Sequence, residues 1–90
     1  MSAAARPRRT PGLVIREIPD DETVLVTSNG QAVVVNAMAS VVVGLADGQR
    51  TVAEIAAEIH AAIRGASRAQ IEGDVARVVG ELTRLGCLET

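Results

Sequence analysis

Few side chains in the sequence have the type and spacing that catalysis requires. His60 and Cys87 are the single histidine and the single cysteine, residue types that serve as general base and as nucleophile. No serine, aspartate or cysteine lies at a telling sequence distance from His60, and no activating cation or motif accompanies Cys87. We therefore expect His60 to be a surface or boundary residue and Cys87 a small apolar residue at a helix end, and we predict no catalytic residue.

Metal and phosphate sites have equally little support. Asp20, Asp21 and Glu22 are adjacent carboxylates, but carboxylates in a turn without further ligands are usually solvated. Gly30 and Gly48 lie outside any glycine-rich strand-to-helix turn with a Lys-Ser/Thr pair, which a phosphate loop needs. One histidine and one cysteine leave no metal-ligand cluster. The sequence thus predicts no metal, no cofactor and no enzyme activity.

The composition indicates a small binding module with an aliphatic core. The 90 residues leave room for one hydrophobic core but not for a second domain. Apolar residues make up 48% of the chain, yet Phe, Tyr and Trp are absent. Because aromatic side chains dominate many interfaces, a binder without them must use backbone pairing and aliphatic pockets.

Charge and hydropathy argue against nucleic acid and membrane partners. The net charge is −2, and the nine basic residues, all Arg, are scattered among acidic ones, whereas nucleic-acid domains present a basic face. No apolar stretch approaches the roughly 20 residues that span a bilayer, and the N-terminal residues lack the apolar block of a secretory signal. The single cysteine excludes an internal disulfide, which suits a reducing compartment. We therefore expect a cytoplasmic protein.

Three strands are predicted in the first half of the chain. Residues 13–18, 23–27 and 32–35 are rich in β-branched side chains, and residues 19–21 form a turn-favouring cluster between the first two runs. Asn29-Gly30 between the second and third runs is a strong hairpin signal, typical of a type I′ turn. The runs are therefore expected to form an antiparallel sheet.

Three helices are predicted to follow. Asn36 can cap a short buried helix over residues 37–46, which Asp47-Gly48 ends. Capping boxes start two more helices, at Thr51-Val-Ala-Glu54 and at Ser67-Arg-Ala-Gln70. Gly65 ends the first of these and Gly86 the second, with Leu88 packing back in a Schellman-like ending. Two apolar faces are expected to pack in the core: Val52, Ile55, Ala56, Ile59 and Ile63 on the first, and Ile71, Val75, Val78, Leu82 and Leu85 on the second.

Strands followed by helices, rather than alternating with them, predict an α+β fold with a three-stranded antiparallel sheet followed by three helices. We expect residues 1–11 to be a disordered N-terminal tail and residues 12–90 to form the domain. A three-stranded sheet can leave an edge unpaired, and an open edge can bind an extended peptide as an added strand.

The order and spacing of several short motifs resemble the PqqD-like family. The family pattern is an aliphatic-Asn pair, a small residue, a buried aliphatic pair, Asp-Gly and Thr-Val-x-Glu-Ile. The matching residues are Val35-Asn36, Ala39, Val42-Val43, Leu45, Asp47-Gly48, Thr51-Val52 and Glu54-Ile55, with Asp74-Val75 and Leu82-x-x-Leu-Gly-x-Leu88 later. The likeness covers about residues 13–88, and the chain departs from the family in having no aromatic residue.

The resemblance implies a winged helix-turn-helix-like recognition element for ribosomally synthesised and post-translationally modified peptides. Such a domain is a peptide chaperone in natural product biosynthesis: it binds the leader segment of a precursor peptide and presents it to a modifying enzyme, such as a radical SAM protein. In the family the leader adds as a strand along the third strand, beside the third helix. The peptide-binding residues implied here are Ala32, Val33, Val34, Val35, Asp74, Val75, Arg77, Val78 and Glu81.

The same residues also have purely structural interpretations. Val33 to Val35 could be an ordinary buried strand, and Asp74, Arg77 and Glu81, spaced by three and four, an ordinary solvated helix face. Two other functions remain open: a winged-helix DNA-binding regulator, and an interaction module that dimerises by edge pairing. The oligomeric state is open between a monomer and a weak homodimer.

Overall fold

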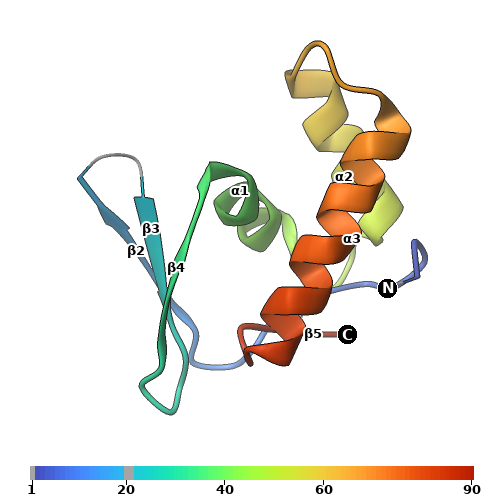
Figure 1. Ribbon diagram of the computed structural model, residues 1–90. Coiled ribbons are helices and arrows are strands. Elements are labelled where there is room, and N and C mark those ends of the chain that lie inside the picture. Colours follow the sequence, from blue (N-terminus) through green and yellow to red (C-terminus); the bar gives the residue numbers. More distant parts are fainter. Residues whose placement is uncertain (1, 20–21) are drawn as a thin grey trace.

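The computed structural model describes residues 2–19 and 22–90. In these ranges a sheet of three strands lies beside a cluster of three helices, with the short helix α1 between the sheet and the longest helix (Figure 1). The expected turn at 19–21 and the acidic cluster at 20–22 fall partly outside the described residues. The α+β fold, with a three-stranded antiparallel sheet followed by three helices, is confirmed, and the winged helix-turn-helix description holds as a loose analogy.

The sheet consists of β2 (Val14–Ile18), β3 (Glu22–Val26) and β4 (Ala32–Val35), in that spatial order and antiparallel throughout. The β3–β4 connection differs from the predicted type I′ turn, since Thr27 pairs with Gln31 around a three-residue loop. Gly30 has a φ of 87° and donates its amide to the carbonyl of Thr27, as in a type I turn followed by a bulge. Asn-Gly therefore predicted the hairpin but not its loop length.

The helices are α1 (Ala37–Leu45), α2 (Val52–Ala62) and α3 (Arg68–Arg84). The Asn36 side chain accepts from the Ala39 amide at 2.9 Å, and both predicted capping boxes are present. The end of α3 is also confirmed: Gly86, with φ 83°, donates to Thr83, and Cys87 donates to Leu82 at 2.9 Å, which is the Schellman pattern.

Ile71, Val75 and Leu82 of α3 are buried as predicted, but the buried face is shifted at two of the five predicted positions. Val79 is wholly buried, whereas Val78 and Leu85 are only half-buried. The reason is geometric, because steps of four keep residues 71, 75 and 79 against α2, while residues 78 and 85 turn toward the sheet. On α2, the helix ends at Ala62, and Ile63, predicted on the buried face, is 42% exposed.

The N-terminal segment is an ordered part of the described fold, which differs from the disordered tail expected over residues 1–11. Arg8–Arg9 form β1, which pairs antiparallel with β5 (Leu88–Glu89) as a second, two-stranded sheet. Pro7 is buried, and the carbonyls of Ala3 and Ala5 accept from amides at the start of α2. These are unpaired amides of a helix N-terminus, so the segment completes the cap of α2.

The hydrophobic core lies where α1, α2 and α3 meet the inner face of the sheet. It is aliphatic, as the composition predicted, and Cys87 is part of it. Only β3 and the end of β4 contribute buried sheet residues, whereas every residue of β2 is exposed. The buried members are Leu25, Val35, Ala39, Val42, Val43, Ala46, Val52, Ile55, Ala56, Ile59, Ile71, Val75, Val79, Leu82, Cys87 and Leu88.

Candidate binding groove

The strand β4 lies at an edge of the sheet, so one side of its main chain has no strand partner within the described sheet. Thr27 donates to Gln31 at 2.9 Å, which marks this pair as a hydrogen-bonded one. Hydrogen-bonded and non-bonded pairs alternate in an antiparallel ladder, and the register pairs Val33 with Leu25 and Val34 with Val24. The N–H and C=O of Val33 therefore point to β3, and those of Val34 point to the open edge.

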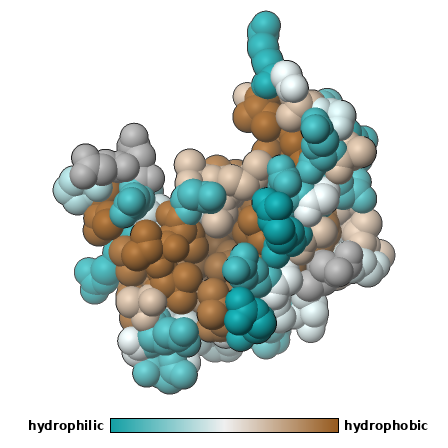
Figure 2. All heavy atoms as spheres, viewed as in Figure 1, coloured by the Kyte–Doolittle hydropathy of each residue, from teal (hydrophilic) through white to brown (hydrophobic). Residues whose placement is uncertain are grey.

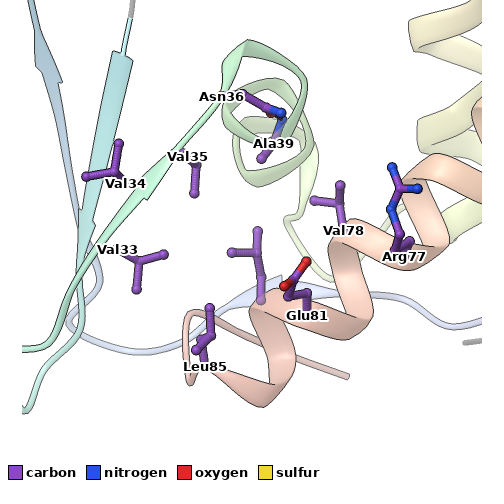
Figure 3. A pocket seen from close by; sticks show the side chains of 10 residues that line it. Val33, Val34, Val35, Asn36, Ala39, Arg77, Val78, Glu81 and Leu85 are labelled. Atoms are coloured by element: carbon purple, nitrogen blue, oxygen red, sulfur yellow. Dashed lines mark hydrogen bonds between the residues drawn. The ribbon is translucent and has the colours of Figure 1, made fainter.

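The open edge of β4 faces a groove of about 270 Å³ bounded by α3 and the start of α1. Val33 and Val35 point their side chains from the strand toward this groove, and Val78 and Leu85 point toward it from α3 (Figure 3). The floor is aliphatic and partly continuous with the core, because Val35, Ala39 and Leu82 are almost wholly buried. The lining residues are Val33, Val34, Val35, Asn36, Ala39, Arg77, Val78, Glu81, Leu82 and Leu85.

Charged side chains occur at the α3 rim of this groove. Two ion pairs lie there: Nη2 of Arg77 is 3.4 Å from Oδ1 of Asp74, and Nη2 of Arg84 is 3.7 Å from Oε1 of Glu81. These are exposed pairs within one helix, which contribute little to stability, so either charge can turn toward a ligand at little cost. In Figure 2 hydrophobic atoms gather over β4 and its neighbourhood, and hydrophilic atoms follow the exposed side of α3. The groove thus combines an apolar floor with a polar rim.

The structure brings together six of the nine residues that the resemblance implied. Val33, Val34, Val35, Arg77, Val78 and Glu81 line one groove. The other three lie outside it: Ala32 is exposed on the same strand, Asp74 is half-buried and paired with Arg77, and Val75 is wholly buried in the core.

Four lining residues were missed by sequence reasoning: Asn36, Ala39, Leu82 and Leu85. Asn36 and Ala39 had been recognised only as a helix cap and a motif position. Leu82 and Leu85 end the apolar spacing of four and three that starts at Ile71, and this signal was interpreted wholly as core packing.

The charged side chains that line the groove are Arg77 and Glu81, and neither His60 nor Cys87 lines it. The side chains whose pKa values are shifted lie outside the groove. A hydrogen bond from the Gln49 amide lowers the pKa of Asp47, one from the Thr51 amide lowers that of Glu54, and burial raises that of Cys87. Among the residues that the structure describes, no three potential ligand side chains cluster as a metal site would need, and no helix has the length and apolarity to cross a membrane.

Comparison with known proteins identifies the family. The family model described as "Coenzyme PQQ synthesis protein D (PqqD)" matches residues 21–88, which is most of the chain. The chain belongs to the PqqD family. The match runs from the start of β3 to β5 and so contains every residue that lines the groove. A search of curated protein sequences finds no match.

Solved structures share the PqqD-family fold over almost the whole chain. The solution structure of the PqqD truncation of Methylobacterium extorquens PqqCD, described as a functional, stand-alone recognition element, has a TM-score of 0.84 and 26% identity, covering 100% of this chain and 95% of that one. TbiB1 in complex with the TbiA(beta) leader peptide has a TM-score of 0.77 and 25% identity, covering 91% and 94%. Lasso peptide synthetase B1, complexed with a leader peptide, is 22% identical with a TM-score of 0.77, covers 96% and 100%, and supports the fold alone.

Proposed function

We propose that this PqqD-family chain binds the leader segment of a ribosomally synthesised precursor peptide by strand addition to β4. The observation that carries the proposal is the open edge of β4 facing an aliphatic groove beside α3. The other sheet edge, β2, is exposed along its whole length and borders a cavity only at its end, where Glu17 and Ile18 lie near α1. The leader-bound structures of similar proteins support the same ligand class.

The groove supplies enough binding energy for a transient complex. Ala32 and Val34 offer two donors and two acceptors at the open edge, each hydrogen bond contributing about 0.5–1.5 kcal/mol. Two aliphatic leader side chains buried against Val33, Val35 and Val78 add about 1.5–3 kcal/mol each. After the cost of ordering the leader, an affinity near the micromolar range follows. Such an affinity suits a chaperone that must release its peptide.

Presentation of the bound peptide to a separate modifying enzyme is supported by membership of the PqqD family. We assign the chain a non-catalytic role in the cytoplasm, where precursor peptides are translated, with a radical SAM protein as one class of partner enzyme. We favour a monomer, because a homodimer paired through β4 would occupy the same edge as the leader. The DNA-binding alternative is not favoured, since the exposed face of α3 mixes both charges.

A titration followed by NMR tests the proposal. The labelled chain receives a synthetic leader from a precursor gene beside its own, and amide shifts are expected for residues 32–36 and for α3 near Val78 and Leu85. A leader of scrambled sequence is the control. Shifts confined to β2 or to the exposed side of α2 would contradict strand addition to β4.

A further inference from the structure

A second apolar surface lies on the side of α1 that faces away from the core. Ala39, Val42 and Val43 are the buried residues of α1, whereas Met38, Val41 and Leu45 line a separate cavity of about 460 Å³ together with the last turns of α2. Val41 is 49% exposed and Ile63, across the cavity, is 42% exposed. We call this surface, with Met38, Val41, Leu45, Ile59, Ala62 and Ile63, the α1 trough.

The α1 trough extends toward the sheet. A neighbouring cavity of about 430 Å³ shares Ala37 and Val41 with it and reaches Ile18, which is 39% exposed at the end of β2. The trough therefore runs along α1, between the start of β3 and the end of α2, and α1 itself lies in the middle of the molecule (Figure 1). Nine helical residues span about 13 Å, so the surface accommodates two to three turns of a partner helix.

The charged residues that line the two cavities are all carboxylates. Glu58 lies at the α2 side, and Glu17 and Glu22 lie at the sheet side. Glu58 pairs with Arg50 at 2.7 Å, while Glu17 and Glu22 make no ion pair within the described part of the chain. An apolar strip with acidic margins is complementary to a helix whose apolar stripe is flanked by Lys or Arg.

From this complementarity we infer that the α1 trough docks a basic amphipathic helix of a partner protein. A second copy of this chain is disfavoured as the occupant, since a symmetric contact would bring the acidic margins of the two copies together. An anionic membrane surface is disfavoured because the acidic margins would be repelled by it.

Docking in the α1 trough leaves the β4 groove free. Near α1 the groove is lined by Asn36 and Ala39, whereas the trough is lined by Met38, Val41 and Leu45. Both surfaces can therefore be occupied at once, with α1 between the two ligands. The identification of this partner as the enzyme that modifies the leader-bound peptide rests on the proposed function. The existence of the trough and its preference for a basic helix do not rest on it.

Model peptides test the inference without any partner being known. The isotope-labelled full chain is titrated with a 14-residue amphipathic helix of Leu and Lys, with a Leu/Glu peptide of identical pattern, and with a scrambled Leu/Lys peptide. We expect saturable amide shifts at Met38, Val41, Ala62 and Ile63 with the first peptide alone. Equal shifts with the Leu/Glu or scrambled peptide, shifts centred on β4 and α3, or no shifts would overturn the inference.

Matched surface variants give a second measurement. Val41→Lys is expected to weaken Leu/Lys peptide binding at least tenfold, whereas Val14→Lys, a similarly exposed valine on β2 outside the trough, is expected to leave it unchanged. Equal effects of the two variants would overturn the inference, as would binding to phosphatidylglycerol vesicles or a dimer in sedimentation that Val41→Lys dissociates. Leader affinity, measured in parallel for both variants, is expected to stay unchanged. The peptide measurement therefore tests docking in the trough, and the leader measurement tests the proposed function independently.

Discussion

Val34 lies opposite Val24 in the β3–β4 ladder, yet its main-chain N–H and C=O point away from β3 toward the open edge. Its side chain is 62% exposed on the outer face of the sheet. The contribution of Val34 to ligand binding is therefore expected to come from its backbone rather than from its side chain.

The first prediction separates backbone from side chain at this position. Val34→Pro removes the amide donor at the open edge, and we expect leader affinity to fall at least about fivefold, as measured by calorimetry. Val34→Ala keeps the donor and should bind within about twofold of the parent chain. Circular dichroism checks that the sheet persists in both variants. Normal affinity of a folded Val34→Pro variant would exclude strand addition through this amide.

The α3 wall of the groove gives the second prediction. Val78 is half-buried and lines the groove, so Val78→Ala removes two methyl groups that a bound leader side chain would cover. At about 0.8 kcal/mol per group, full coverage corresponds to a loss of affinity of roughly tenfold and partial coverage to less. Val41→Ala, a truncation of the same size outside the groove, is the control, and an equal loss there would show that the effect is not local.

The third prediction concerns a chain that lacks residues 2–9, which should be less stable. Besides the β1–β5 ladder, four main-chain hydrogen bonds join this segment to the rest of the fold, through Ala3, Ala5, Pro7 and Arg9. Their loss, partly offset by the regained chain entropy, should lower the free energy of unfolding by about 1–3 kcal/mol and Tm by roughly 5–20 °C. Leader affinity should be retained, because no residue of the segment lines the groove. An unchanged Tm would mean that the segment behaves as the tail the sequence predicted.

The fourth prediction concerns the capping box of α2. The Thr51 amide donates to the Glu54 carboxylate at 2.9 Å and lowers its pKa below the ordinary value of 4.5. A carboxyl with a depressed pKa in the folded state stabilises the fold above its unfolded pKa, and this stabilisation is lost as pH falls through the folded value. Glu54→Gln should therefore lower Tm at pH 6, and the difference from the parent chain should narrow below about pH 4. A constant difference across this range would contradict the carboxylate's role.

Local signals in the sequence were enough to predict the strands, the helices and their caps. Asn29-Gly30, the Asn36 cap and the two capping boxes act over three or four residues, and each is visible in a short window. The β1–β5 pairing was not predictable in this way, because it joins residues about 80 positions apart in two-residue strands without a hydrophobic pattern. Bringing these distant residues together costs chain entropy, and the contacts that offset this cost exist only in the folded chain.

The groove was predictable only in part. The three strands implied only that one sheet edge could stay open, and the choice of β4, like that of Arg77, Val78 and Glu81, came from the family resemblance. Apolar periodicity could not separate core from groove on α3, because Val75 and Val78 differ by only about 60° around the helix. The packing of α2 decided between them, burying Val75 and Val79 and leaving Val78 and Leu85 toward β4.

The antiparallel pairing of β1 with β5 also determines how the domain bears a mechanical load. In this register Arg8 faces Glu89, so force applied to both chain ends opens the ladder from its outer pair and breaks its bonds one after another. Bonds loaded singly yield at lower force than bonds loaded together. Pulling on the two ends should therefore release the bonds of Ala3 and Ala5 to α2 and unzip this short sheet while β4 and α3 keep their spacing.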